Sequence, residues 1–393
     1  MDRNTKRHLK DIDKHVPYDE MKVRKQAGKI RRAMRKGKGE VPRDNRVTED
    51  NWETLLDLHG QTPKRASIAD IAASLQPDTA DVQVSDADYA TAPIVISVGS
   101  GRCRVFDATD DGGVERDVVV PQEIAVRQKS ALAVGDRVRI EEESGIWRLR
   151  EILPRHTVLA RPDPFHAHLQ RLIAANVDVV IHVVSVKAPP LRPRLIDRFL
   201  IAIQRGGAQP VICVNKVDLI DDEELLGMEL ERLDVYRKLG VPVIACSTKT
   251  REGLDELRAQ VQGKMSALVG HSGVGKSSIL NALNESLQLA TNTVHRKRST
   301  GRHTTTASTL YDFGDGTYLI DTPGIREFGL WDLDRESLRD YFPEFAEPSE
   351  LCRFTNCTHV HEPDCEVKDR VEAEELDDGR YETYVRLWED LAS

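Results

Sequence analysis

A glycine-rich segment ending in a lysine and two serines gives this sequence its clearest chemistry. The segment reads Gly270-His271-Ser272-Gly273-Val274-Gly275-Lys276-Ser277-Ser278. Its glycines allow backbone N–H groups to wrap the phosphates of a nucleotide without clashes from Cβ atoms. Lys276 brings positive charge to the β- and γ-phosphates, and the Ser277 hydroxyl is placed to bind Mg²⁺. An apolar strand precedes the segment and a helix follows it, so it predicts a nucleotide site without distinguishing GTP from ATP.

Two shorter segments upstream indicate that the base is guanine. They read Asn215-Lys216-Val217-Asp218 and Ser247-Thr248-Lys249. The Asp218 carboxylate can accept hydrogen bonds from both N1–H and the N2 amino group of guanine, whereas adenine would leave it unpaired. Ser247 is expected to border the base. Either segment alone also suits an ordinary turn after a strand, but together with the phosphate loop they predict GTP.

A third set of residues is typical of a switch that responds to hydrolysis. Asp321-Thr322-Pro323-Gly324 follows an apolar strand, and Thr304-Thr305-Thr306 precedes that strand. Asp321 would hold Mg²⁺ through water, and the Gly324 N–H would sense the γ-phosphate. One of the threonines should bind Mg²⁺ in the GTP state, and Thr305 is the preferred candidate.

The residue that orients the attacking water is not evident. Ile325 follows Gly324, where many GTPases carry a glutamine, and an apolar side chain cannot orient water. His303, beside the threonine cluster, is the best local candidate for that role. An exposed loop histidine is also often incidental, so a binding partner remains an alternative source of the catalytic group.

Four potential metal ligands lie within a short stretch near the C-terminus. They are Cys352, Cys357, His359 and Cys365. Three thiolates and one imidazole suit a closed, structural Zn²⁺ site, although His361 could replace His359. The alternative is three unrelated cysteines, but half of the six cysteines in the chain fall in this stretch. The others lie in strand-like runs and are expected to be core residues. They are Cys103, Cys213 and Cys246.

Three kinds of element would position these residues. Residues 92–158 contain short strand-like runs with glycine-rich corners, including Ala125–Arg127, and suit a closed barrel of the OB type. Residues 159–330 alternate strands and helices, which predicts a parallel sheet covered on both faces. Helices are expected at Leu191–Arg205, Glu223–Leu239 and Leu254–Val261. Residues 331–393 predict a mostly helical, zinc-binding domain.

The charge of the chain is polarised. Residues 1–46 contain 16 Lys and Arg and 7 Asp and Glu, a balance of +9, whereas the whole chain carries −9. The remainder therefore carries −18. A basic N-terminal extension, taken as residues 1–91 and partly helical or disordered, favours RNA as a partner. A merely solvated tail is the alternative.

The apolar runs of the sequence are short. None approaches the ~18 residues of a membrane span, and the N-terminus lacks the apolar core of a signal peptide. The cysteines are too few for a disulfide framework. We therefore expect a soluble, cytoplasmic monomer with no membrane partner.

The order of these motifs is unusual, because an ordinary GTPase begins with the phosphate loop and ends with the guanine segments. Here the guanine segments come first, which predicts a circular permutation. A barrel, a permuted GTPase, Arg302-His303-Thr304-Thr305-Thr306 and the Cys/His cluster, in that combination, resemble the bacterial RsgA (YjeQ) family of small-ribosomal-subunit biogenesis GTPases. The resemblance covers about residues 92–393. The basic extension exceeds what is expected of that family.

The resemblance implies a function and a set of site residues. It implies binding to the 30S subunit and its 16S rRNA late in maturation, with GTP hydrolysis stimulated by the subunit and coupled to release. It also implies nucleotide contacts from Asn215–Asp218 and Gly270–Ser278, and zinc ligation by the cluster ending at Cys365. Two alternatives stay open: an RNA-binding assembly factor that uses GTP mainly as a ligand, and a P-loop ATPase or kinase.

The permuted order also suggests a route for conformational change. Asp321–Gly324 is the last GTPase motif in the chain, and the zinc cluster follows it closely. We hypothesise that permutation connects the γ-phosphate switch directly to an RNA-facing zinc domain. Hydrolysis would then change how the flanking domains hold the ribosome.

Overall fold

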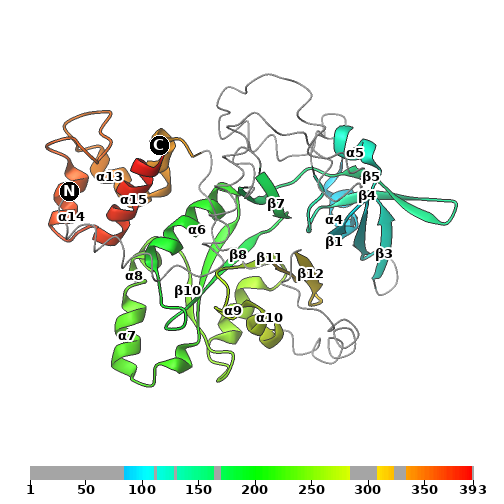
Figure 1. Cartoon of the computed structure of the whole chain (residues 1–393), viewed down its shortest axis with the longest axis horizontal. Coiled ribbons are helices and arrows are strands. Elements are labelled where there is room, and N and C mark those ends of the chain that lie inside the picture. Colours follow the sequence, from blue (N-terminus) through cyan, green and yellow to red (C-terminus); the bar gives the residue numbers. More distant parts are fainter. Residues whose placement is uncertain are drawn as a thin grey trace, which may run out of the picture. The chain divides into compact units, whose positions relative to one another are not determined.

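The computed structural model describes residues 84–109, 113–127, 131–162, 170–283, 308–322 and 333–391 (Figure 1). The chain separates into two compact units, Met1–Thr62 and Pro63–Ser393. All described residues belong to the second unit, so nearly the whole predicted N-terminal extension lies outside them. Among the described residues, no helix is long and apolar enough to cross a bilayer.

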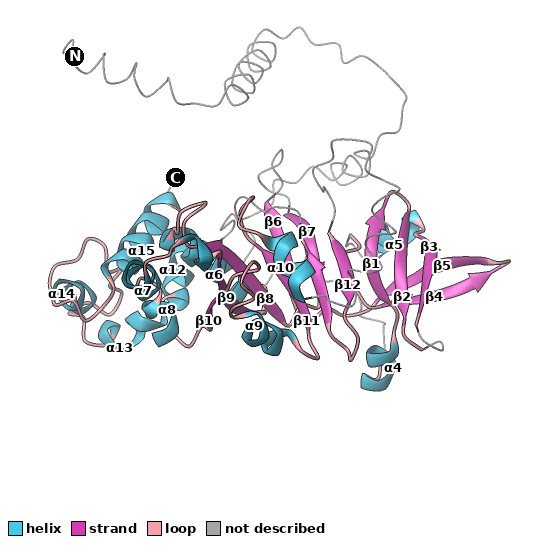
Figure 2. Cartoon of the chain, turned by 90° about the horizontal axis from the view of Figure 1, so that it is seen from below, coloured by secondary structure: helices cyan, strands magenta, loops and turns pink. Residues whose placement is uncertain are grey.

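The first part of the described chain is a five-stranded sheet (Figure 2). Its strands are β1 Ile94–Gly99, β2 Arg102–Asp107, β3 Val114–Val119, β4 Val138–Glu143 and β5 Ile146–Ile152. They pair in the order β1-β2-β3-β5-β4, and only β3 and β5 run parallel. An isolated bridge between Ile94 and Arg137 brings the two edges together. The short helix α4, Asp86–Thr91, precedes β1.

Turn chemistry and buried aliphatic residues explain this sheet. Ser144 and Gly145 join β4 to β5 with φ of 54° and 78°, and two positive φ values in a two-residue loop favour a tight antiparallel hairpin. Alternate residues such as Val105 and Leu149 form one apolar core. The predicted strand at Ala125–Arg127 is wrong, because these residues end helix α5, Gln122–Arg127. A run of three residues is too short for its hydrophobic pattern to distinguish a strand from one turn of a helix.

The next part is a six-stranded sheet in the order β10-β9-β8-β11-β13-β12. Its strands are β8 Val179–Ser185, β9 Gln209–Asn215, β10 Val243–Ala245, β11 Met265–Val269, β12 Thr309–Asp312 and β13 Tyr318–Asp321. All neighbours run parallel except β12 and β13. Every residue of β8 and β11 is buried, as expected for central parallel strands with both faces covered.

Helices cover both faces of this sheet (Figure 1). They are α6 Pro193–Arg205, α7 Glu223–Glu231, α8 Asp234–Lys238, α9 Leu254–Val261 and α10 Lys276–Leu283. Val180 of β8 shares a core cluster with α6, whereas its neighbour Ile181 shares another with α9 and α10. The single helix predicted over Glu223–Leu239 is instead two helices separated by Arg232 and Leu233.

A hairpin joins the closed sheet to the parallel one. It consists of β6 Val158–Pro162 and β7 Gln170–Ala175. The backbone N–H of Ala175 donates to the Val134 carbonyl at 2.9 Å, and the Asn176 amide donates to the Gly135 carbonyl at 3.0 Å. Gly135 has φ of +90°, and a Cβ there would lie 2.2 Å from the Ala175 carbonyl oxygen. Only glycine permits this close contact.

The C-terminal part is helical. Its α-helices are α12 Arg335–Leu338, α13 Ala346–Ser349, α14 Glu366–Glu372 and α15 Asp378–Asp390. Two 3₁₀ turns, Arg339–Tyr341 and Pro343–Phe345, lie between α12 and α13. The aromatic side chains of Phe342, Phe345 and Tyr384 form its core, and Ile201 of α6 joins the same cluster.

A buried ion network joins α15 to α6. Arg380 is 3% exposed and donates to Asp197 of α6 at 2.9 Å and to Glu344 at 2.7 Å. The Tyr236 hydroxyl of α8 donates to the same Asp197 carboxylate at 2.8 Å. Burial raises the pKa of Asp197, although Arg380 opposes that shift. The C-terminal helices are therefore held against the helix that follows β8.

Candidate nucleotide-binding site and metal centre

The glycine-rich segment forms a loop from the end of β11 to the start of α10. A Cβ at Gly270 would lie 2.3 Å from the Val183 carbonyl oxygen of β8, and one at Gly275 would lie 2.2 Å from the Asn215 amide nitrogen. Both glycines also have positive φ, 140° and 102°. The first glycine therefore lets the loop leave the sheet beside β8, and the second lets it approach the guanine segment.

Lys276 lies at the first position of α10 and folds back over the loop. Its Nζ donates to the Gly270 carbonyl at 2.7 Å and to the His271 carbonyl at 3.2 Å. Burial lowers the pKa of Lys276, and the negative charge of Asp321 opposes that shift. These carbonyl oxygens accept the hydrogen bonds that the phosphate oxygens of a bound nucleotide would accept from the ammonium.

Oxygen groups suited to Mg²⁺ lie near this lysine in space or follow it in the sequence. Asp321 ends β13, directly across from Leu268 of β11. Its Oδ1 is buried and has no hydrogen-bond partner in the described part of the chain, and burial raises the pKa of its carboxyl. Ser277 and Ser278 are exposed in the first turn of α10. A carboxylate and a hydroxyl are hard ligands that fit Mg²⁺, and a cation would compensate the orphaned carboxylate oxygen.

The segment at Asn215 holds the phosphate loop from the other side. The Asn215 amide donates to the Val274 carbonyl at 2.8 Å. Lys216 Nζ donates to the Gly273 carbonyl at 2.5 Å and to the Ala188 carbonyl at 2.6 Å. Residues from the two predicted motifs are thus in direct contact across β9, β8 and β11, and the carbonyl of Ala188 is a partner that the sequence did not reveal.

Ser247 supports the residue that would read the base. It is fully buried, and its Oγ donates to Asp218 Oδ1 at 2.6 Å. The same Oγ accepts the backbone N–H groups of Lys249 and Thr250 at 3.1 Å. Lys249 Nζ lies 3.8 Å from Asp218 Oδ2. The hydroxyl of Ser247 therefore orients the Asp218 carboxylate, and a contact between Ser247 and the base stays a prediction.

A buried histidine behind the loop was not singled out from the sequence. His182 of β8 is fully buried and stacks on Phe199 of α6, with ring centroids 3.9 Å apart. Burial, with a smaller contribution from Lys276, lowers its pKa to about 3. Its imidazole therefore stays neutral at physiological pH and adds no positive charge to the phosphate loop.

Three of the four residues predicted to act in catalysis lie outside the described residues. They are His303, Thr305 and Gly324. Of that group, the structure places only Asp321 beside the phosphate loop. The roles predicted for the other three stay predictions.

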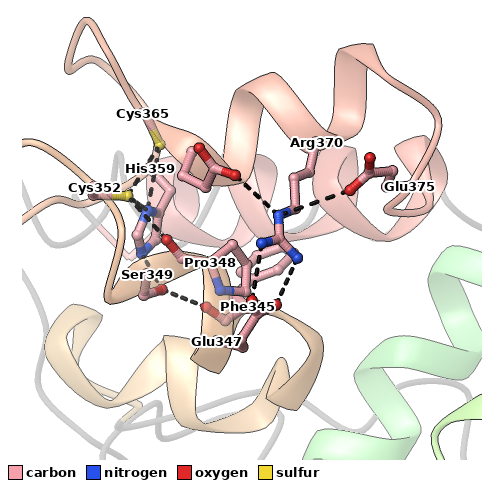
Figure 3. A network of polar contacts seen from close by, with 10 residues as sticks. Phe345, Glu347, Pro348, Ser349, Cys352, His359, Cys365, Arg370 and Glu375 are labelled. Carbon is pink, nitrogen blue, oxygen red and sulfur yellow. Dashed lines mark hydrogen bonds and ion pairs between the residues drawn. The ribbon is translucent and has the colours of Figure 1, made fainter.

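The Cys/His cluster is assembled as the spacing predicted, and Figure 3 shows three of its four members, Cys352, His359 and Cys365. The ligand atoms of Cys352, Cys357, His359 and Cys365 all lie within 4.8 Å of one another. The Sγ atoms of Cys352 and Cys365 are 3.8 Å apart. The Nδ1 atom of His359 lies 3.6 Å from the Cys352 Sγ and 3.4 Å from the Cys365 Sγ. Ligands about 2.0–2.3 Å from one tetrahedral zinc stand roughly 3.5–3.8 Å apart. The donor set and spacing therefore fit Zn²⁺.

Contacts around the cluster identify His359 as the histidine ligand and orient its ring (Figure 3). The Nε2 atom of His359 lies 3.0 Å from the Ser349 hydroxyl, which donates to the Phe345 carbonyl at 2.5 Å. His361 is exposed and lies outside the cluster. Burial raises the pKa of Cys357 to about 12, and a bound cation would stabilise its thiolate instead. Of the two histidines, His359 is the one placed to ligate a metal.

Comparison with known proteins agrees with these features. A profile of the RsgA GTPase family matches residues 152–331. Two proteins named small ribosomal subunit biogenesis GTPase RsgA, from Gemmatimonas aurantiaca and Thermotoga neapolitana, are each 40% identical to this chain. Those alignments cover 66% and 67% of this chain and 84% and 85% of the relatives.

Solved structures give the same result. The crystal structure of YjeQ from Thermotoga maritima aligns with a TM-score of 0.61 and 34% identity over 77% of this chain and 98% of that one. YloQ, described as a circularly permuted GTPase, aligns with a TM-score of 0.59 and 28% identity over 76% and 94%. The fold and site therefore define a circularly permuted GTPase that hydrolyses GTP. Within that class, the chain belongs to the RsgA GTPase family.

Proposed function

We propose that this protein acts in late maturation of the small ribosomal subunit, with GTP hydrolysis stimulated by the subunit and coupled to release. The observation that carries the GTP part is the direct packing of the guanine segment on the phosphate loop, through Asn215 and Val274. The ribosomal part rests on relatives that carry the name small ribosomal subunit biogenesis GTPase. The partners would be the 30S subunit with its 16S rRNA, met in the cytoplasm by a monomer.

The nucleotide would lie across the ends of β11, β9 and β13. Backbone N–H groups of residues 270–275 and the Lys276 ammonium would bind the phosphates, and Asp218, held by Ser247, would read the guanine edge. Ser277, Asp321 and Thr305 would hold Mg²⁺, which when bound neutralises charge that develops on the β- and γ-phosphates. His303 would orient the attacking water, and the Gly324 N–H would report loss of the γ-phosphate.

The parts of the chain that flank the GTPase domain would bind RNA. The strand order β1-β2-β3-β5-β4, with meeting edges and α5 between β3 and β4, supports an OB barrel, a fold that often binds single-stranded nucleic acid. The Cys/His cluster supports a structural zinc in the helical C-terminal domain. The +9 charge of residues 1–46 supports a further polyanion contact.

A second candidate is an RNA-binding assembly factor that uses GTP mainly as a ligand. Ile325 favours it, because it cannot orient water as a glutamine would. Hydrolysis by the purified chain with and without small subunits separates the two candidates. Stimulation of at least about tenfold supports the proposal, whereas unchanged slow turnover together with nucleotide-insensitive binding to the subunit would support the alternative.

A further inference from the structure

Arg370 of α14 makes a set of ion pairs beside the metal centre that the four ligands do not account for (Figure 3). Its guanidinium donates to both carboxylate oxygens of Glu347 on α13, at 2.5 Å and 2.9 Å. Its Nε atom donates to Glu366 of the same helix at 3.1 Å and lies 3.8 Å from the Glu375 carboxylate. Of these three carboxylates, that of Glu347 lies on a different helix, so its pair with Arg370 joins α13 to α14.

The two helices that this pair joins carry the two halves of the metal centre. Helix α13 ends at Ser349, whose hydroxyl lies 3.0 Å from Nε2 of His359, and Cys352 lies three residues beyond it. Cys365 directly precedes α14. Because a structural site is closed by four protein ligands, its ion can leave only after a ligand has moved away. Separation of α13 from α14 would move Cys352 away from Cys365, whose Sγ atoms are 3.8 Å apart.

The geometry of the pair between Arg370 and Glu347 is more favourable than that of an ordinary surface ion pair. Two parallel N–H···O bonds fix the guanidinium against the carboxylate, and the Arg370 side chain is 23% exposed although Glu347 itself is exposed. Hydrogen bonds from Arg370 hold the pKa of Glu347 below its usual value. A second pair, Arg353 with Asp364, also lies beside the two cysteines, but its side chains are 65% and 63% exposed. Such exposed pairs contribute little.

We propose that Arg370 is a positioning residue for the metal centre, which holds α13 against α14 and thereby slows the release of zinc. It acts from outside the ligand set, because its pair with Glu347 resists the movement that would separate Cys352 from Cys365. The pair adds to the effect of the metal and does not replace it, since ion pairs at a surface are too weak to hold such a region alone. The inference rests on the zinc of the proposed function.

The test is the rate at which the full chain loses zinc to an excess of the chromogenic chelator pyridylazoresorcinol, after zinc content has been measured by plasma mass spectrometry. Outer partners that contact a ligand directly are worth about 10- to 100-fold in metal affinity, and Arg370 acts one contact further out. Arg370→Ala and Glu347→Ala should therefore each release zinc about fivefold faster than the parent chain. A parent chain without stoichiometric zinc would overturn the proposed metal and this inference with it. Bound zinc with unchanged release in both variants would overturn this inference alone.

Glu375→Ala is the matched control for Glu347→Ala. Both substitutions remove an exposed carboxylate beside Arg370, but Glu375 follows α14 in the same segment and does not join it to α13. Glu375→Ala should release zinc within about twofold of the parent rate. Release as fast as that of Glu347→Ala would show a general effect of charge and overturn the proposal. Faster release in Arg370→Ala but not in Glu347→Ala would mean that Arg370 only supports its own helix through Glu366, which also overturns it.

Coupling between the two residues tests whether they act as one pair. Arg370→Ala combined with Glu347→Ala should release zinc about as fast as Arg370→Ala alone, because the second substitution removes no further contact between the helices. Independent effects would instead multiply to about 25-fold and overturn the proposal. An unchanged melting temperature verifies the fold of each variant. Glu347→Gln, which keeps the shape of the side chain, tests the same pair if Arg370→Ala lowers the melting temperature, and parent-like release by it would overturn the proposal.

Discussion

The nucleotide site and the metal centre are assembled by different means. At the nucleotide site, backbone carbonyls of the phosphate loop receive hydrogen bonds from Asn215, Lys216 and Lys276, so adjacent strands of one sheet hold the site in place. At the metal centre, the ligands come from loops around α13 and α14, and their side chains converge on one point. The nucleotide site is therefore supported by the sheet itself, whereas we expect the metal centre to depend on a bound ion.

Removal of zinc is expected to have the largest effect. Cys357→Ser should abolish stoichiometric zinc binding and unfold the region from α13 to α14, because structural zinc contributes on the order of 10 kcal/mol to such regions. Zinc content by plasma mass spectrometry and hydrogen exchange of residues 346–372 report both effects. GTP affinity should stay within about twofold, since the nucleotide site has its own supports; a larger loss would show that the two regions are not separately assembled.

Loss of Arg380 is expected to be nearly as damaging. Arg380→Ala would leave Asp197 buried without its cation, which should lower the free energy of unfolding by about 3–5 kcal/mol. Urea unfolding followed by tryptophan fluorescence measures the change. Arg194→Ala removes an exposed ion pair to Glu382 between the same two helices and should cost less than about 1 kcal/mol. Similar losses in both variants would mean that the buried network is not what joins α15 to α6.

Lys276→Ala should reduce GTP hydrolysis by about 100- to 1000-fold, because its ammonium would stabilise charge on the transferred phosphate. The rate of phosphate release under saturating GTP tests this, with an unchanged melting temperature as the control. Ser277→Ala should be similarly inactive through loss of a Mg²⁺ ligand. Near-normal turnover by either variant would contradict the assignment of the phosphate loop.

Asp218→Asn should weaken GTP binding by about 10- to 100-fold, because the amide mismatches the donors of guanine. It should also improve binding of xanthosine triphosphate, whose base presents an acceptor where guanine presents a donor. Competition against labelled GTP measures both affinities. A variant that retained the GTP preference of the parent would show that Asp218 does not read the base.

The smallest effect is expected at Ser247. Ser247→Ala removes the hydroxyl that holds Asp218, and the loss of one such hydrogen bond should weaken GTP binding by about 1 kcal/mol, or fivefold. Titration with GTP and ATP would test it. A variant with full GTP affinity would show that Asp218 needs no support from the neighbouring loop.

Motif chemistry was predictable from the sequence, whereas many of the contacts were not. The glycines, Asn215 and the four metal ligands were predicted because residue type and local spacing define them. The hydrogen bond from Ser247 to Asp218 depends on how two loops meet, and the pair Asp197–Arg380 spans 183 residues. The helix break at Arg232 likewise depends on packing of Leu233 into the core, which overrides helix propensity.

The structure offers a second physical connection between the nucleotide site and the C-terminal helices, besides the direct chain connection that the permuted order suggests. The segment from 323 to 332, which would connect the switch to the C-terminal helices, lies outside the described residues. The described part shows instead that α15 is held on α6 by Arg380. The loop before α6 supplies the Ala188 carbonyl to Lys216 of the guanine segment. A shift of α6 would therefore move contacts of both the C-terminal helices and the guanine segment. Such a movement on hydrolysis stays a prediction.

The most direct test of a preassembled, guanine-specific site is displacement of labelled GTP from the purified chain. GDP should displace it at concentrations near its own dissociation constant, and ATP should fail even at about 1000-fold excess, because adenine lacks the two N–H donors of guanine that the partly buried Asp218 carboxylate would accept. Displacement by ATP at concentrations similar to GDP would contradict the role given to Asn215, Asp218 and Ser247.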